Sequence, residues 1–109
     1  SNTYFPILSY YFHYISDENN IIFMTLCDAK YPNQVAFTFL EALRKEFLMQ
    51  FSQEEINRAT TYSFNPTFRN KIMSKMDYYN KNQVVDNNIS RLKGGVLAFK
   101  DEVLQAAGL

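Results

Sequence analysis

The stretch YYFHYISDENNIIFMTLC at residues 10–27 decides the fold class, because it holds two short aromatic and β-branched runs around a polar turn. The runs at residues 10–16 and 21–27 are predicted to be strands, and SDENN between them has the length and polarity of a hairpin connection. We therefore expect the two strands to pair antiparallel. Both alternating sets of side chains in residues 10–16 are bulky and largely apolar, so both faces of the sheet need cover.

The run TYFPILS at residues 3–9, directly before the hairpin, is predicted to be a third strand. Pro6 within this run has no N–H to donate to a ladder, so we expect the strand to lie at an edge of the sheet.

Two amphipathic helices are predicted after the hairpin, and the first occupies residues 31–55, where Pro32 can open it. Its inner stripe recurs every three or four positions and comprises Val35, Ala36, Phe39, Leu40, Leu43, Phe47 and Phe51. Its outer side comprises Gln34, Glu41, Lys45 and Gln50, and we expect Glu41 to form an ion pair with Lys45.

The second helix is predicted within residues 62–80, where Asn65 can cap it and Pro66 can open it. Its expected inner face comprises Phe68, Ile72, Met76 and Tyr79. No further helix candidate is left for the second face of the sheet, so either a segment is missing from this sequence or that face binds a partner. The predicted fold class is α+β, an antiparallel sheet packed by helices.

Charge and cysteine content exclude several function classes. Lys and Arg total 11 and Asp and Glu total 11, so the formal net charge is zero and nucleic acid is not an expected partner. A single cysteine, Cys27, excludes an intramolecular disulfide and indicates a reducing compartment. The sequence shows no secretory signal and no stretch near the roughly 18 apolar residues that span a bilayer, so we expect it to be soluble as it stands.

Residues 82–106 have the apolar spacing of a coiled coil. The repeating positions, alternately three and four residues apart, form what we call the seam and comprise Asn82, Val85, Ile89, Leu92, Val96, Phe99, Val103 and Ala106. Gly94 and Gly95 interrupt it, and each costs roughly 1 kcal/mol in a helix interior. The segment is predicted to be a poor helix alone and to order when partners bury the seam. The alternative is an ordinary third helix packed on the domain.

Candidate catalytic residues are few. His13 lies on a strand among tyrosines and is interpreted as a core histidine, and Cys27 is interpreted as a small buried apolar residue. A His13–Cys27 dyad across the hairpin would have no third group to orient it. Gly94 and Gly95 are not followed by the lysine and hydroxyl residue of a phosphate-binding loop. We expect no catalytic residues, no cofactor and no metal site.

Four motifs stand in the order and spacing of a known family: FHYI at 12–15, LCDAKYP at 26–32, VAFTFLEALRKEF at 35–47 and YSF at 62–64. They resemble the longin domain, the profilin-like module at the N-terminus of a class of vesicle SNAREs, and most resemble the Sec-twenty-two type that shuttles between endoplasmic reticulum and Golgi. The resemblance covers residues 10–104. It implies a longin-like domain at residues 1–80 that lacks the family's first hairpin and first helix, followed at 81–109 by part of a SNARE coiled-coil motif.

The resemblance also implies how such a protein would act. The seam would zipper with three glutamine-bearing Q-SNARE helices to fuse membranes, and the longin domain would fold the SNARE segment back and present the closed form to vesicle coat proteins. We expect a membrane anchor beyond Leu109 and a location on the cytosolic face of endoplasmic reticulum and Golgi membranes. The family's central layer holds an arginine, whereas the aligned position here is Ala106. Either the protein is a divergent SNARE, the alignment slips near its end, or fusion activity is lost.

The strand at residues 21–27 lies in the middle of the sheet in the family, so here it is expected to present an apolar edge. We expect a homodimer or domain swap through Ile21–Cys27, or a preceding segment outside these residues. Two other functions remain open. One is a regulatory longin module without fusion activity, and the other is a profilin-like protein-binding domain or small enzyme, which rests on fold analogy alone.

Overall fold

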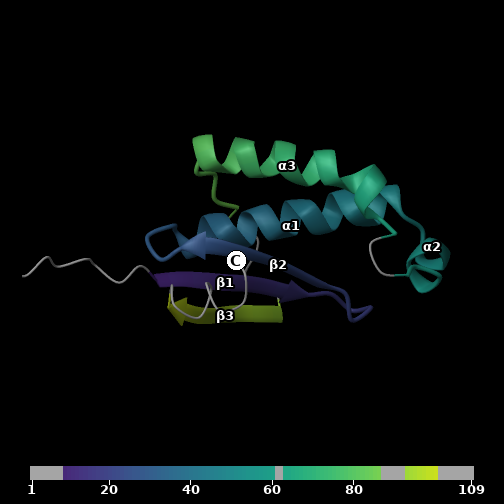
Figure 1. Cartoon of the computed structure of the whole chain (residues 1–109), viewed down its shortest axis with the longest axis horizontal. Helices are drawn as coiled ribbons and strands as arrows, with labels where there is room; N and C mark the ends of the chain where they lie inside the picture. The colour runs from purple at the N-terminus through teal and green to yellow at the C-terminus, as the bar shows by residue number, and fades with distance from the viewer. Residues whose placement is uncertain (1–8, 61–62, 87–92, 101–109) are drawn as a thin grey trace, which may run out of the picture.

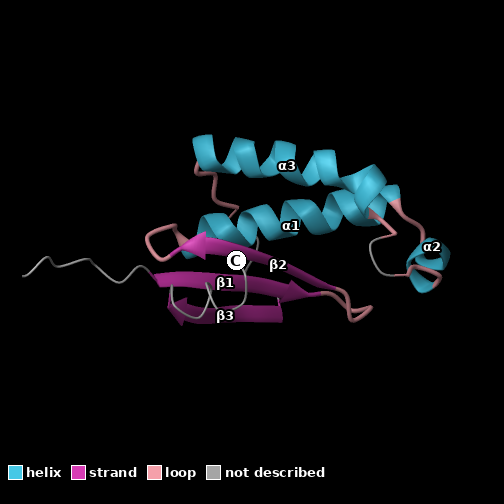
Figure 2. Cartoon of the chain, in the orientation of Figure 1, coloured by secondary structure: helices cyan, strands magenta, loops and turns pink. Residues whose placement is uncertain are grey.

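The computed structural model describes residues 9–60, 63–86 and 93–100. Its elements follow one another as β1 (Ser9–Ser16), β2 (Ile22–Asp28), α1 (Asn33–Gln50), α2 (Gln53–Asn57), α3 (Asn65–Lys81) and β3 (Lys93–Lys100). Figure 1 shows α1 lying between the sheet and α3, and Figure 2 separates the magenta sheet from the cyan helices. The predicted α+β class, with an antiparallel sheet packed by helices, is confirmed.

β1 and β2 form the expected antiparallel hairpin. The turn is closed by the Asp17 N–H, which donates to the Ile21 carbonyl at 3.0 Å. The Asp17 carboxylate accepts the N–H groups of Asn19 and Ile21 at 2.9 and 3.1 Å. Asn20 has a φ of 61°, a left-handed conformation that asparagine tolerates better than most residues. The polar run between the strands therefore supplies both the turn's hydrogen bonds and its unusual backbone.

The sheet has the order β2-β1-β3, and its third strand was not predicted as one. β3 pairs antiparallel with β1 from Ser9↔Lys100 to Ser16↔Lys93. The strand predicted at residues 3–9 lies outside the described residues except for Ser9, which begins β1.

α1 follows its sequence pattern closely. The helix begins at Asn33, directly after Pro32, whose extended ψ of 129° ends the preceding loop. The seven residues of the predicted inner stripe are all buried: Val35, Ala36, Phe39, Leu40, Leu43, Phe47 and Phe51. Most of them join Ile15 of β1 and Phe68 of α3 in one cluster, so α1 is the central element of the core.

The expected outer side of α1 is wrong at one position. Glu41 is buried, and its carboxylate accepts two hydrogen bonds from the Arg44 guanidinium, at 2.8 Å from Nε and 2.5 Å from Nη2. The predicted partner, Lys45, is exposed. A guanidinium can donate bidentate hydrogen bonds to both oxygens of a buried carboxylate, whereas a lysine ammonium acts as a point charge.

A short helix, α2, replaces the predicted end of the first helix. Ser52 caps it, accepting the Glu55 N–H at 3.2 Å while the Glu55 carboxylate accepts the Ser52 N–H at 3.1 Å. This reciprocal capping box starts a new helix, with two residues separating it from the end of α1. The sequence signature S-x-x-E was present at residues 52–55 but lay within the longer predicted helix.

α3 packs on α1, and its predicted inner face differs at one position. Phe68 is buried, and Ile72 and Tyr79 pack against the core. Met76, expected on the same inner face, is 46% exposed. Phe64 takes the cap position expected of Asn65, and Pro66 lies in the first turn.

The face of the sheet opposite α1 carries exposed apolar side chains, as the missing helix candidate led us to expect. His13 and Ile15 point toward α1 and are fully buried. The opposite set on β2 is exposed, with Ile22 at 61%, Met24 at 51% and Leu26 at 36%. β2 is also an edge strand of the sheet that the described residues form.

Candidate functional site

The chain returns to the sheet after α3 instead of continuing as a helix. Asn82 ends α3 in an extended conformation, and Val84 donates its N–H to the Asn82 carbonyl at 2.8 Å. The Asp86 N–H donates to Thr38 Oγ1 of α1 at 3.0 Å, so the segment runs over α1. Residues 93–100 then form β3 on the free side of β1. In this structure β3 is part of the same sheet as the rest of the domain.

The seam residues that can be placed are therefore not on a helix. Asn82 and Val85 lie in the extended connection, and Val85 is 40% exposed. Val96 and Phe99 lie on β3, opposite His13 and Tyr10. The remaining members fall outside the described residues: Ile89, Leu92, Val103 and Ala106. Among the described residues of this segment, 82–86 and 93–100, none is helical.

The strand also breaks up the seam geometrically. Residues three apart lie on the same side of a helix but on opposite faces of a strand. Val96 and Phe99 would share one face in a coiled coil, whereas their positions on β3 alternate across the sheet. The strand and the seam are two mutually exclusive arrangements of the same residues.

Gly94 and Gly95 fit the strand much better than they fit a helix. A Cβ on Gly94 would overlap the carbonyl oxygen of Tyr14 and lie 2.8 Å from Ile15 Cα. A Cβ on Gly95 would lie 3.1 Å from the Tyr14 hydroxyl. The backbone of β3 therefore approaches β1 at a distance that glycine at position 94 permits.

His13 is a core histidine with one satisfied ring nitrogen. Its side chain is fully buried, and Nε2 lies 2.9 Å from Asn33 Oδ1 at the start of α1. The ring packs edge-on against Phe37 at a centroid distance of 5.4 Å. Nδ1 has no hydrogen-bond partner within the part of the chain that the structure describes. The residue thus fixes the start of α1 against β1.

Cys27 is a free, half-buried cysteine. Burial raises the pKa of its thiol above the usual value, and the hydrogen bond with Thr25 offsets only part of that effect. A raised pKa keeps the neutral thiol, whereas nucleophilic cysteines need a lowered one. Cys27 lies opposite Tyr11 in the strand ladder, and Tyr11 is two residues from His13. His13 forms its hydrogen bond with Asn33 and not with Cys27.

Residues 9–60, 63–86 and 93–100 hold neither a metal site nor a membrane-spanning helix. In that part of the chain no three His, Cys, Asp or Glu side chains gather in a way that could hold a metal ion. No helix there is both long and apolar enough to cross a bilayer.

Comparison with protein families matches residues 5–72 to Longin, described as a regulated-SNARE-like domain. No solved structure matches the chain.

Several curated proteins are similar to the chain. Vesicle-associated membrane protein 7A of Dictyostelium discoideum is 32% identical over 90 residues, covering 78% of this chain and 41% of that protein. Protein transport protein sec22 of Schizosaccharomyces pombe is 40% identical over 47 residues, covering 43% of this chain and 21% of that protein. Vesicle-trafficking protein SEC22a of Rattus norvegicus is 31% identical over 70 residues, covering 64% and 23%. The chain thus spans less than half the length of the relatives it matches.

Proposed function

Since the chain belongs to the longin family, we propose that it is the regulatory domain of a vesicle SNARE together with the first part of its SNARE motif. The names of its relatives support this proposal, because one is a vesicle-associated membrane protein and two are named for protein transport or vesicle trafficking. In such a protein the function is assembly with partner helices and not catalysis.

The observation that carries the proposal is the position of β3. Residues predicted to zipper with partner helices are held as a strand on the longin sheet, tied to α1 by the Asp86–Thr38 hydrogen bond. We infer that this is a closed state. Partner helices that bind the helical form of the seam would draw β3 off β1, and the shift can be no larger than their differential affinity for the two forms.

The proposed assembly surface is the seam, whose layer residues are Val85, Ile89, Leu92, Val96, Phe99, Val103 and Ala106. Burial of these layers among three Q-SNARE helices would stabilise the bundle at roughly 25 cal/mol per Å² of apolar surface. Two relatives are named for the sec22 type, and in line with the resemblance to that type we propose transport between endoplasmic reticulum and Golgi, with the chain on the cytosolic face of those membranes. An anchor outside these residues and recognition of the closed form by vesicle coat proteins complete the proposal.

A regulatory longin module without fusion activity is the second candidate. Ala106 favours it, because alanine at the central layer offers no donor to three partner glutamines. Gly94 and Gly95 favour it too, because they suit the strand and weaken the helix.

Circular dichroism of the chain, extended through its natural C-terminus, tests the proposal when it is mixed with three Q-SNARE helices of endoplasmic reticulum and Golgi. We expect more helix than the sum of the parts and a complex that resists heating. Gly94→Ala should accelerate the gain, because the added Cβ collides with Tyr14 and releases β3. Gly108→Ala is the matched control, since it adds the same helix propensity outside β3.

One result would decide against fusion activity, and another would decide against the closed state. No gain in helix with either variant would leave the regulatory module as the better reading. Equal acceleration by Gly94→Ala and Gly108→Ala would mean that helix propensity, and not release of β3, limits assembly.

A further inference from the structure

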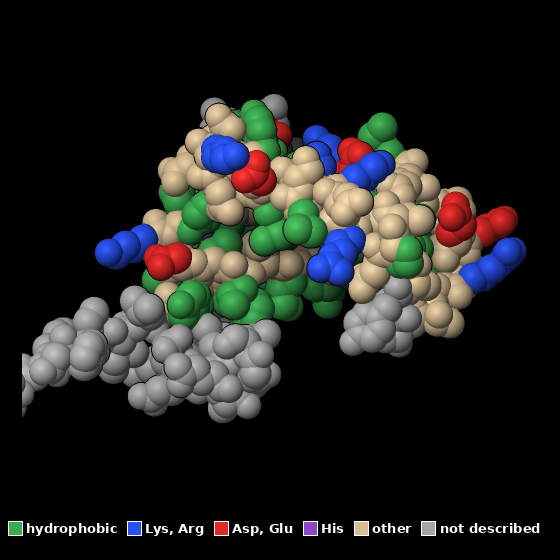
Figure 3. All heavy atoms as spheres, turned by 45° about the horizontal axis from the view of Figure 1, so that its top comes forward, with side chains coloured by type: hydrophobic (Ala, Val, Ile, Leu, Met, Phe, Trp, Pro, Cys, Tyr) green, Lys and Arg blue, Asp and Glu red, His purple; other side chains and the backbone are tan. Residues whose placement is uncertain are grey.

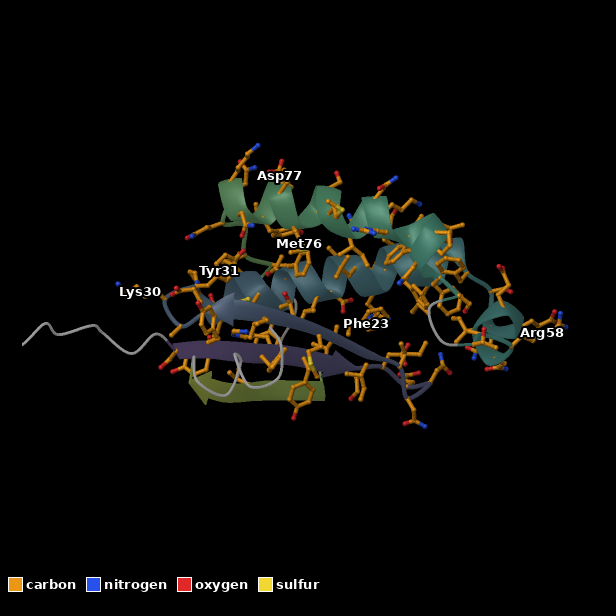
Figure 4. The ribbon with its side chains drawn as sticks, viewed as in Figure 1. Phe23, Lys30, Tyr31, Arg58, Met76 and Asp77 are labelled. Carbon is orange, nitrogen blue, oxygen red and sulfur yellow. The ribbon has the colours of Figure 1, made fainter. Side chains whose placement is uncertain are left out.

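β3 gains little side-chain burial that could fix its alignment with β1. β1 is the main neighbour of β3 among the described elements. Figure 4 shows β3 on the side of β1 away from β2 and its labelled residue Phe23. Figure 3 shows hydrophobic side chains gathered in the band between the helices and the sheet, where α1 and α3 pack. Val96 of β3 is 37% exposed. Burial against the helices therefore does little to fix the alignment of β3.

The apolar pattern of β3 does not fix its alignment either. Both alternating sets of residues in Lys93–Lys100 contain apolar members: Val96 and Ala98 in one, Leu97 and Phe99 in the other. A slip of two residues along β1 would keep each set on its own face, and a slip of one would only exchange two apolar sets. Glycine-rich strands with such a pattern are prone to slippage, yet β3 forms one ladder, with His13 opposite Val96.

The two glycines of β3 meet a particular place on β1. Gly94 lies opposite Ile15, and Gly95 lies opposite Tyr14. A Cβ on Gly94 would overlap the Tyr14 carbonyl oxygen, which as a backbone atom can move only with its strand. A Cβ on Gly95 would lie 3.1 and 3.3 Å from Oη and Cζ of Tyr14, so the phenol ring covers this glycine. We call Tyr14 and Ile15 the glycine site, because their backbone limits position 94 and the ring limits position 95.

A slipped ladder would bring larger residues to the glycine site. A slip of two residues would place either Val96 and Leu97 or Leu92 and Lys93 there. A slip of one residue would place Val96 opposite the Tyr14 ring or Lys93 opposite Ile15. Each of these residues would carry a Cβ into the space that the two glycines leave free. Every alternative alignment therefore meets a collision that the observed one avoids.

We propose that the glycine site selects the register of the tail, with Tyr14 as the specificity-determining residue. β1 then accepts residues 93–100 in one alignment and rejects a strand that lacks paired glycines. The inference rests on the closed state proposed above and adds that this state is a single ladder and not a family of slipped ones. One consequence is that Lys100 is held opposite Ser9, so the chain leaves the sheet at a fixed end of β1.

The first test moves the glycine pair along β3 in the intact chain. A fourfold variant, Gly94→Val with Gly95→Leu, Val96→Gly and Leu97→Gly, keeps the composition and moves the pair by two positions. Hα–Hα nuclear Overhauser contacts report the register, because Hα atoms of directly opposite residues approach closely in non-hydrogen-bonded pairs. The parent should show a contact between His13 and Val96. The variant should instead show one between His13 and Ala98, because the moved pair returns to the glycine site.

The second test exchanges size between the two strands. The Leu97 amide reports docking, because even-numbered residues of β1, Phe12 among them, direct their backbone groups toward β3. Gly95→Val should raise its hydrogen-exchange rate about tenfold, since the branched side chain meets the Tyr14 ring. Adding Tyr14→Ala should return the rate to within about twofold of Tyr14→Ala alone. Tyr10→Ala, on the same face of β1, is the matched control and should not restore it.

Position 94 separates the backbone of the glycine site from its ring. Gly94→Val should not be rescued by Tyr14→Ala, because its Cβ meets the Tyr14 carbonyl oxygen, which alanine keeps. Rescue of Gly94→Val by Tyr14→Ala, or an undisturbed ladder in Gly95→Val, would contradict the proposal. Contacts between Phe12 and Leu26 of the β1–β2 hairpin show that each variant is folded.

Failure of the register selection and failure of the closed state are distinguishable. A parent chain without the His13–Val96 contact would overturn both, since residues 93–100 would not be docked on β1. A parent with this contact, and a fourfold variant in which His13 still lies opposite position 96 or β3 is lost, would overturn the register selection alone. Movement of the contact to Ala98 supports it.

Discussion

In α1 and in β3 apolar residues stand three or four positions apart, yet the first stretch is a helix and the second is a strand. α1 contains no glycine or proline, follows Pro32 directly, and buries its stripe against β1 and α3. β3 begins with a lysine and two glycines, and it pairs with the side of β1 that β2 does not use. The difference teaches that apolar spacing decides a helix only where backbone propensity and an available surface agree with it.

The largest effect is expected in α1. Leu40 is fully buried at the centre of the cluster, so Leu40→Ala should lower the free energy of unfolding by about 2–5 kcal/mol. Urea denaturation measures this loss. Met49→Ala on the same helix removes an 84% exposed side chain and should change stability by less than about 0.5 kcal/mol. Similar losses for the two variants would mean that α1 is not held by its stripe.

The next effect separates the two regions. Gly94→Val should detach β3, because a Cβ there collides with the backbone of Tyr14, and the loss should be about 1–3 kcal/mol. Amide exchange should rise along the side of β1 that faces β3 while α1 stays protected. Gly95→Ala is the matched control, since its Cβ would meet only the end of the Tyr14 side chain. A smaller loss for Gly94→Val than for Gly95→Ala would contradict the close approach.

A smaller effect is expected where the connection that leads to β3 contacts α1. Thr38→Val removes the oxygen that accepts the Asp86 N–H and should cost about 1 kcal/mol. Thr38→Ser keeps the hydroxyl and should cost less. Denaturation of both variants, with exchange at the Asp86 amide as a local readout, checks the contact. If the Asp86 amide exchanges equally in both, the tail is not held to α1 by this hydrogen bond.

The smallest effect is expected at high pH, at the point where the tail leaves α3. Burial, together with the charges of Cys27 and Tyr79, raises the pKa of Tyr31, and burial also raises the pKa of Tyr79. The folded state therefore favours the neutral phenols, and this stabilisation is full below about pH 10 and is lost as the pH rises through the folded values. Denaturation midpoints measured at increasing pH should fall less steeply in Tyr31→Phe than in the parent, with Tyr10→Phe as control. Parallel curves would exclude Tyr31 as a source of the alkaline loss.

Much of the domain could be predicted because its signals are local. The turn at Asp17–Asn20, the start of α1 after Pro32 and the buried stripe each follow from residues a few positions apart. The partner of Glu41 was predicted wrongly because lysine and arginine at neighbouring positions give the same charge pattern, and only burial selects the guanidinium. Ser52 and Glu55 carried a readable capping signal that a longer apolar pattern concealed.

The candidate site could be predicted only in part, because it depends on a contact between distant residues. The sequence of Lys93–Lys100 does not show that one side of β1 is available for pairing. Without the contact to Tyr14, the two glycines indicate only a weak helix. The exposed apolar face of the sheet was predictable, since no helix candidate was left to cover it.

The strand form of residues 93–100 also sets a length. Eight residues span about 27 Å as a strand and about 12 Å as a helix. Winding this stretch into a bundle therefore shortens it by roughly 15 Å, about half the thickness of a bilayer's hydrocarbon core. Dissociation of β3 from β1 and its folding into a helix would therefore be a contraction, which would move the chain after residue 100 closer to the domain.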